Sequence, residues 1–348
     1  MRGAVFLGDR KVELRSFPDP APGPGEVVIA MKASGMCGSD LKFYRSPPGA
    51  AQAALGLGNL TEPFIAGHEP CGVVVARGPG VSEREAPDGQ RVMDHHYAGC
   101  GLCPHCRVGW SQLCRAGITV YGVTAHGGHA DYLKVPVRTL VPLPEELSFA
   151  EGAAVACGTG TAFSALKRMS LCGGDTLAVF GQGPVGLSAT LLGAAMGARV
   201  IAVETNAERR KLAKEFGADV VIDGGREALK QILETTKGQG VDLSLECSSA
   251  PAARQAAVRC VKTWGTACFV GEGGDVVLDV SPDLLRRQVT LIGSWTFSAM
   301  GMLDCARFVV ERKIALEKIF SHRWRLEQAA EAYRSFDTQS TGKGVFLL

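Results

Sequence analysis

The sequence predicts an α/β protein in which a β-rich region precedes a doubly wound, six-stranded parallel sheet. Two observations carry this prediction. Short apolar runs separated by Pro/Gly turns fill residues 1 to about 155, and from Asp175 onward apolar runs alternate with helical patterns. At 348 residues, the chain is long enough for about two domains.

The elements of the first region are short strands. Glu26–Lys32 and Cys71–Ala76 are apolar runs bounded by turn sequences such as PDPAPGPG. In the second region, strands are expected at 176–181, 199–204, 219–223, 241–248, 266–271 and 289–295. Helices are expected at 184–197, 206–217, 226–236 and 251–263. Helices at 302–313 and 325–336 should then lead to a last strand at 344–348, which we expect to return to the first domain.

The composition is that of an ordinary globular chain, with 46% hydrophobic and 21% charged residues. A net charge of +2 without a basic block argues against nucleic acid or an anionic membrane as partner. The N-terminal segment lacks the apolar core of a signal peptide, and no uninterrupted apolar run is long enough to span a bilayer. We therefore expect a cytoplasmic protein whose twelve cysteines are reduced.

The most specific motif is the run CGLCPHCRVGWSQLC, which has the spacing C-x2-C-x2-C-x7-C. Four thiolates can surround one metal ion tetrahedrally, and zinc favours this shell in closed structural sites. Two disulfides or an iron–sulfur cluster are the alternatives, and the absence of an export signal disfavours disulfides. We predict a structural zinc held by Cys100, Cys103, Cys106 and Cys114.

A glycine-rich loop predicts a dinucleotide site, because G-x-G-x-x-G here follows a predicted strand and opens a predicted helix. The expected pyrophosphate-binding residues are Gly181, Gly183, Pro184, Val185 and Gly186. The next strand ends at Glu204, whose carboxylate can accept both ribose hydroxyls and would repel a 2′-phosphate. This favours NAD, although the nearby Arg209 and Arg210 keep NADP as an alternative.

The motifs GMCGSDLKFY, GHEPCGVV and ACGTGTAFSAL, with the closing TGKGVF, complete an ordered set around the cysteine run and the glycine loop. Over nearly the whole chain, this set resembles the zinc-dependent medium-chain alcohol and polyol dehydrogenases, such as sorbitol and threonine dehydrogenases. The resemblance implies a GroES-like catalytic domain with two zinc sites at 1–157 and 294–348. It also implies a Rossmann dinucleotide-binding domain at 158–293 and a homodimer or homotetramer.

The resemblance also implies the roles of single residues. A catalytic zinc would be held by Cys37, His68 and Cys157, with Glu69 as a transient fourth ligand. Ser39 would take the substrate proton, and Asp40 would orient the ligating histidine. Thr161 would touch the nicotinamide, and Arg209 is also expected to bind the cofactor.

One position departs from the family pattern. Many relatives carry a proton-relaying histidine five residues after the first cysteine ligand, where this chain has Lys42. A charged ammonium is a poor base, so Lys42 relays the proton only if its pKa is lowered; otherwise it contacts cofactor or substrate, or is a plain surface lysine. The Gly/Ala/Pro-rich segment 45–60 is expected to line or cover the substrate site.

The expected activity is hydride transfer between a secondary alcohol (a polyol, sugar alcohol or similar hydroxylated small molecule) and NAD. A threonine-type amino-alcohol dehydrogenase or a simple alcohol dehydrogenase is the first alternative. A zinc-less quinone or enoyl reductase, or a non-catalytic relative, is the second, but such relatives usually lack the Cys37/His68/Cys157 set that is intact here.

Overall fold

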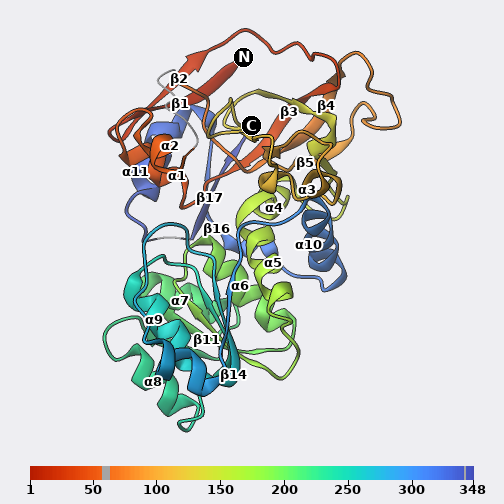
Figure 1. Cartoon of the computed structure of the whole chain (residues 1–348). Coiled ribbons are helices and arrows are strands. Elements are labelled where there is room, and N and C mark those ends of the chain that lie inside the picture. Colours follow the sequence, from red (N-terminus) through yellow and green to blue (C-terminus); the bar gives the residue numbers. More distant parts are fainter. Residues whose placement is uncertain (57–62, 341) are drawn as a thin grey trace. The chain divides into compact units, whose positions relative to one another are not determined.

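The structure is a computed structural model that describes residues 1–56, 63–340 and 342–348 (Figure 1). The chain divides into two compact units. Unit 1 consists of Met1–Gly160, Phe297–Gln339 and Lys343–Leu348, and unit 2 of Thr161–Thr296 and Ser340–Gly342. The main boundaries fall after residues 160 and 296, each three residues beyond the limits predicted at 157 and 293.

Unit 1 is organised around the long strand β3 (Glu26–Gly35) of a seven-stranded sheet. β3 pairs antiparallel with β4 (Pro70–Arg77), β8 (Tyr132–Pro136) and β17 (Lys343–Leu347). The pairing with β17 returns the C-terminal end to the first region, as the sequence predicts. Five other strands complete this sheet and a small neighbouring one: β16 (Phe320–Trp324), β5 (Arg91–Asp94), β9 (Leu140–Pro142), β6 (Tyr97–Ala98) and β7 (Thr119–Val120). β1 (Arg2–Gly8) and β2 (Lys11–Ser16) form a hairpin.

Most helices of unit 1 are short, and several carry or flank predicted site residues. They are α1 (Asp40–Arg45), α2 (Ala50–Ala54), α3 (Pro104–Arg107), α4 (Phe149–Ala154), α10 (Ala299–Glu311) and α11 (Ala329–Phe336). A π-helical turn at Val155–Thr159 joins α4 to α5 (Gly160–Arg168). Single 3-10 turns occupy Ser111–Leu113, Val137–Thr139, Leu316–Ile319 and Leu326–Gln328.

Unit 2 contains the predicted six-stranded parallel sheet, in the order β12-β11-β10-β13-β14-β15. Its strands are β10 (Thr176–Phe180), β11 (Arg199–Glu204), β12 (Val220–Asp223), β13 (Val241–Glu246), β14 (Val261–Phe269) and β15 (Thr290–Gly293). Its helices are most of α5, α6 (Pro184–Ala195), α7 (Ala207–Glu215), α8 (Ala228–Thr235) and α9 (Pro251–Cys260), with irregular turns at Val280–Leu284 and Leu285–Arg287. The strand order reverses beside β10, the arrangement that binds dinucleotides in doubly wound sheets.

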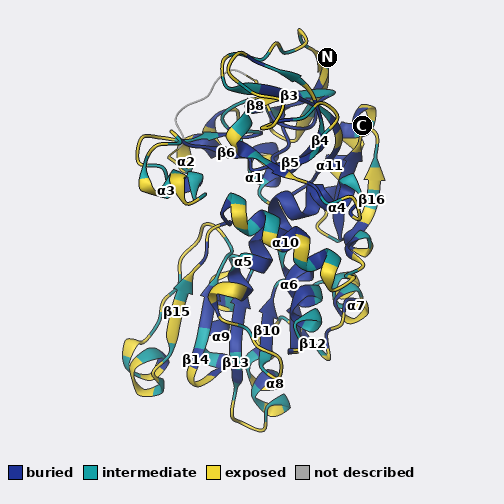
Figure 2. Cartoon of the chain, turned by 90° about the vertical axis from the view of Figure 1, so that its right-hand side faces the viewer, coloured by how far each residue is buried: buried dark blue, intermediate teal, exposed yellow. Residues whose placement is uncertain are grey.

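The predicted α/β fold class is therefore confirmed, and several element boundaries differ. The helix expected at 325–336 begins at Ala329, and the strand expected at 266–271 begins at Val261. The helix expected at 251–263 ends at Cys260, because Val261 pairs with Val241 and begins β14. Val261 is 2% exposed, so burial in the sheet outweighs the continuing helical pattern. Figure 2 shows the central strands β10 and β13 buried, whereas the edge strand β15 is largely exposed.

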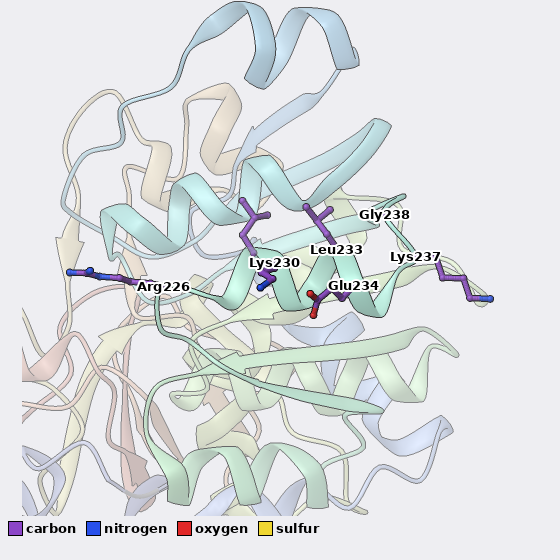
Figure 3. A pocket seen from close by; sticks show the side chains of 7 residues that line it. Arg226, Lys230, Leu233, Glu234, Lys237 and Gly238 are labelled. Carbon is purple, nitrogen blue, oxygen red and sulfur yellow. The ribbon is translucent and has the colours of Figure 1, made fainter.

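No helix among the described residues is both long and apolar enough to cross a membrane. A shallow hollow on unit 2 is lined by α8 and its flanking turns, residues 226–238 (Figure 3). The side chains of Arg226 and Lys237 extend away from its two ends, and none of its lining residues belongs to a predicted site.

Candidate functional site

Four predicted ligands from distant parts of the sequence lie together in unit 1. The ligand atoms of Cys37, His68, Glu69 and Cys157 are all within 4.8 Å of one another, and all four residues are buried. Cys37 follows β3, His68 and Glu69 directly precede β4, and Cys157 lies in the π-helical turn Val155–Thr159. Single π-helical turns are rare and often mark functional sites.

Two glycines make room for this cluster. A Cβ on Gly35 would lie 1.9 Å from Oε2 of Glu69, so only glycine allows that carboxylate to lie against β3. Gly67 has a φ of +93°, and a Cβ there would lie 2.3 Å from Nδ1 of His129. The backbone before His68 therefore takes a conformation, and a close approach, that favour glycine.

Asp40 contacts two of the predicted ligands at once. Its Oδ2 accepts a hydrogen bond of 2.8 Å from the backbone N–H of Cys37, and its Oδ1 lies 2.8 Å from Nδ1 of His68. The other ring nitrogen of His68, Nε2, lies 3.3 Å from the hydroxyl of Ser39. With Nδ1 occupied by Asp40, Nε2 is the nitrogen left to act as a ligand, and Ser39 lies beside it.

Lys343 is a buried cation that the sequence interpretation did not single out. Its Nζ forms an ion pair with Glu69 and donates a hydrogen bond of 3.1 Å to the carbonyl oxygen of Met36. Both Lys343 and Glu69 are 0% exposed. In the sequence, Lys343 is marked by its place in the closing motif TGKGVF. That motif does not predict a buried ion pair, because lysines are rarely buried and one sequence does not show burial.

The electrostatics of the cluster favour a bound cation. Contact with Cys157, assisted by His68 and Lys343, holds the pKa of Cys37 well below its ordinary value, and the same contact raises that of Cys157. Burial raises the pKa of Glu69 to about 7, although Lys343 acts in the opposite direction. The lowered pKa of Cys37 favours its thiolate, which is the form that binds a metal ion.

The donor set of this cluster fits zinc. Two cysteine sulfurs and one imidazole are the ligand types of a catalytic zinc with an open position. The sulfurs of Cys37 and Cys157 are 3.9 Å apart. Two thiolates on one tetrahedral zinc, each with a Zn–S bond of about 2.3 Å, are separated by about 3.8 Å.

The second cluster is formed by the predicted cysteine run. The sulfurs of Cys100, Cys103, Cys106 and Cys114 also lie within 4.8 Å of one another, and no disulfide joins them. Sulfur–sulfur distances of 3.5 Å (Cys103 to Cys106) and 3.9 Å (Cys103 to Cys114) fit the same tetrahedral spacing. The backbone N–H groups of Leu102 and Cys103 point at the sulfur of Cys100, each at 3.4 Å, which stabilises a thiolate.

The predicted glycine loop joins β10 to α6 in unit 2. Gly181 has a φ of +83°, and a Cβ on Gly186 would lie 1.8 Å from the carbonyl oxygen of Gly181, so neither position favours a side chain. Gly183 caps α6, and Pro184 and Val185 form its first turn. Backbone N–H groups at this helix start are suited to a pyrophosphate.

Glu204 ends β11, is 7% exposed and lies against this loop. Its Oε2 accepts a hydrogen bond of 2.6 Å from the N–H of Gln182, and its Oε1 accepts one of 2.9 Å from Asn206. A Cβ on Gly183 would lie 4.0 Å from Nη1 of Arg209, so the guanidinium of Arg209 also reaches the loop. Arg210 instead donates to the carbonyl oxygens of residues 204 and 205, a structural role.

Two further predicted residues lie on helices. Thr161 is buried on α5, and Lys42 is half-buried on α1. Of the segment 45–60 predicted to line the substrate site, residues 57–60 lie outside the described residues, and the rest includes α2.

Two family models match the chain. Residues 23–145 match the alcohol dehydrogenase GroES-like domain, and residues 184–311 match the zinc-binding dehydrogenase model. An uncharacterised zinc-type alcohol dehydrogenase-like protein of Escherichia coli (strain K12) is 39% identical over 351 residues, which covers 99% of this chain and 98% of that protein.

Two proteins with more specific names are also similar over almost their full length. The L-threonine 3-dehydrogenase of Pyrococcus horikoshii is 32% identical over 348 residues, covering 97% of this chain and 95% of the relative. The solved structure of an alcohol dehydrogenase from Thermus sp. ATN1 superimposes with a TM-score of 0.88 at 27% identity, covering 100% of this chain and 99% of that one.

Proposed function

Because this chain belongs to the zinc-binding alcohol dehydrogenase family, we propose that it oxidises a secondary alcohol, such as a polyol or sugar alcohol, with NAD as hydride acceptor. The observation that carries the proposal is the buried cluster of Cys37, His68, Glu69 and Cys157. Its donor atoms suit a zinc ion with an open position, and the hydroxyl of Ser39 lies 3.3 Å from His68 Nε2.

The proposed reaction separates a proton from a hydride. Zinc, when bound by Cys37, His68 and Cys157, supplies a Lewis acid that makes the alcohol proton easier to remove. The Ser39 hydroxyl accepts that proton and passes it toward solvent. NAD, if held by the glycine loop 181–186 and Glu204, would supply the acceptor for the hydride that the alcohol loses when it becomes a ketone.

The residues around the proposed ligands hold those ligands in position and compensate their charge. Asp40 holds the His68 ring by its Nδ1 and the Cys37 backbone by its N–H. Lys343 compensates the buried charge of Glu69, so that this carboxylate can stay near the ligands.

NAD is proposed over NADP because Glu204 ends the second strand of the unit 2 sheet. A buried carboxylate at this place offers acceptors to ribose hydroxyls and disfavours a 2′-phosphate. The guanidinium of Arg209 near Gly183 supports the alternative that a phosphate is bound there. For Lys42 we propose contact with cofactor or substrate rather than proton relay, because a lysine needs a strongly lowered pKa to act as a base.

An amino alcohol is the second candidate substrate. Its support is the 32% identity to an L-threonine 3-dehydrogenase over 97% of this chain. The two substrate classes differ by one ammonium group, which needs a carboxylate or carbonyl partner near the alcohol.

The test is a screen of polyols, simple secondary alcohols and threonine-type amino alcohols against NAD and NADP, followed by the absorbance of reduced nicotinamide. A Cys157→Ser variant is the matched control and should lose nearly all turnover while still binding the nucleotide. We expect turnover of a secondary alcohol with NAD. Turnover that is unchanged in Cys157→Ser, or a wild-type protein without zinc in the Cys37 cluster, would contradict the proposal.

A further inference from the structure

A row of hydrogen-bonded, buried polar side chains continues from Asp40 into the core of unit 1. It consists of Tyr333, His129 and Ser34, and we call it the file. The hydroxyl of Tyr333 donates a hydrogen bond of 3.1 Å to Oδ2 of Asp40. Nε2 of His129 lies 2.7 Å from the same hydroxyl, and the hydroxyl of Ser34 lies 2.7 Å from Nδ1 of His129. Ser34, His129 and Tyr333 are each 0% exposed and Asp40 is 1% exposed, so the file ends inside the protein.

The chemistry of these groups sets the direction of each hydrogen bond. A phenol has one proton, and Tyr333 gives it to Asp40, so Tyr333 must accept from Nε2–H of His129. The unprotonated Nδ1 of His129 then accepts from Ser34. Burial lowers the pKa of His129 to about 4, which agrees with a neutral ring carrying one proton. Every donor in the file therefore points toward Asp40.

Packing holds both rings in place. The ring of Tyr333, on α11, meets Phe6 edge-on with centroids 4.7 Å apart and lies 5.6 Å from the ring of Tyr44. The backbone N–H of His129 donates to the carbonyl oxygen of Ala66 at 2.9 Å. The His129 ring also occupies the space that a Cβ on Gly67 would need. The file thus contacts the loop carrying His68 through both its backbone and its side chain.

We propose that Tyr333 and His129 are positioning residues for the metal ligands, and that they act by holding the carboxylate of Asp40 against His68 and the backbone of Cys37. Asp40 receives the N–H of Cys37 and the hydroxyl of Tyr333 on one oxygen and contacts His68 with the other. A carboxylate fixed on three sides cannot rotate, so the ring of His68 keeps one orientation. This inference rests on the proposed zinc site.

The decisive variant is Tyr333→Phe, which removes one hydroxyl from a fully buried ring. Its matched control is Tyr44→Phe, because Tyr44 is a buried neighbour of the same aromatic cluster that does not belong to the file. The readouts are the rate at which a chelator removes zinc from the holoenzyme and the visible absorption spectrum after cobalt replaces the catalytic zinc. Cys37→Ser identifies which release phase belongs to the catalytic site.

We expect Tyr333→Phe to lose the catalytic zinc about 10-fold faster, at the lower end of the effect of residues that support metal ligands. The cobalt spectrum should shift, and release from the four-cysteine site and all properties of Tyr44→Phe should stay as in the wild type. Wild-type zinc release together with an unchanged cobalt spectrum in Tyr333→Phe would overturn the inference.

A double variant separates positioning from a purely structural role. Tyr333→Phe leaves the buried N–H of His129 without its acceptor, whereas His129→Phe with Tyr333→Phe replaces both polar partners by apolar rings. We expect the double variant to recover part of the thermal stability, because the His129 N–H is removed while the hydroxyl of Ser34 loses its acceptor, but to keep the fast zinc release. Recovery of both properties would show that the file serves only stability and would overturn the inference. A wild-type protein that holds no zinc at Cys37 would instead refute the proposed function.

Discussion

At the scale of single residues, the candidate site is a set of charges that compensate one another inside the protein. Cys37, His68 and Glu69 are all less than 7% exposed, and Asp40 and Lys343 supply the opposite charges or donors. A buried charge without such a partner costs several kcal/mol, so each residue depends on its neighbours.

Ser39→Ala should lower kcat by about 10²–10⁴-fold, the usual contribution of a general acid–base group. The hydroxyl lies beside the ligating nitrogen of His68 and has no other predicted task. Steady-state kinetics measures the effect, and unchanged zinc content and nucleotide affinity serve as controls. Turnover close to that of the wild type would mean that water or another group removes the proton.

Lys343→Met should lower the free energy of unfolding by about 3–5 kcal/mol, because it leaves the carboxylate of Glu69 buried without its cation. Denaturant unfolding measures the change. The double variant Glu69→Gln with Lys343→Met should recover most of it, since no uncompensated charge remains. Equal stability of the single variant and the wild type would mean that the ion pair is not formed in solution.

Glu204→Ala should weaken NAD binding by about 10–100-fold, the value of one charge-assisted hydrogen bond of 1.5–3 kcal/mol. NADP binding should change less, so the ratio of the two kcat/KM values should fall. Arg209→Ala, on α7, is the matched variant and should affect NADP more than NAD. A wild-type preference for NADP would refute the role of Glu204.

At the scale of elements, the two cysteine-bearing sites depend on different kinds of structure. The four-cysteine site is made within fifteen consecutive residues, 100–114, by α3 and two turns. The Cys37 site is assembled from β3, β4 and the turn Val155–Thr159, which only the sheet brings together. Loss of a metal from the first should therefore unfold a lobe, and loss from the second should stop turnover.

Cys103→Ser should remove about one zinc per chain and lower the melting temperature, because a closed structural zinc contributes directly to folding. Turnover at low temperature should persist, since Cys37, His68 and Cys157 are untouched. Elemental analysis and thermal unfolding measure the two effects. Full zinc content with unchanged stability would show that the four cysteines hold no metal.

At the scale of the whole molecule, a buried carboxyl group that is not a predicted metal ligand should make stability depend on pH. Asp94, at the end of β5, is 0% exposed, and burial raises its pKa to about 7 from 3.8, although Thr139 acts in the opposite direction. Between these two values, the folded chain keeps a proton that the unfolded chain has lost. The contribution of Asp94 to stability therefore falls as pH rises from about 4 to 7.

Asp94→Asn should remove this penalty and raise the free energy of unfolding by a few kcal/mol at pH 8, with little change at pH 4. Melting temperatures of the wild type and the variant over this pH range provide the measurement. Asp275→Asn is the control, because Asp275 is exposed. Parallel pH profiles for the wild type and Asp94→Asn would contradict the prediction.

Also at the scale of the whole molecule, the homodimer or homotetramer that the family resemblance implies remains a prediction. The edge strand β15 leaves Leu291 41% exposed, and Trp264 on the neighbouring strand is 78% exposed. Exposed apolar groups beside an unpaired sheet edge favour pairing with another chain.

Local patterns were sufficient for the fold class, for the alternation of strands and helices in unit 2 and for the four-cysteine spacing, because each of these depends on residues that are neighbours in the sequence. Alternating apolar runs predict strands wherever they later pair, and the C-x2-C-x2-C-x7-C run needs no distant partner. The end of α9 at Cys260 was missed because pairing of Val261 with Val241 lies outside any local window.

Burial and long-range contact were decided only by the tertiary structure. Lys343 meets Glu69, Tyr333 meets Asp40 and His129 meets Tyr333, each across more than 200 residues of sequence. No local pattern marks a lysine, a tyrosine or a histidine as fully buried, since most are exposed or half-exposed in proteins. Their roles follow from low polarity around them, where an unpaired charge or hydroxyl is costly, and that environment exists only once the sheet of unit 1 has formed.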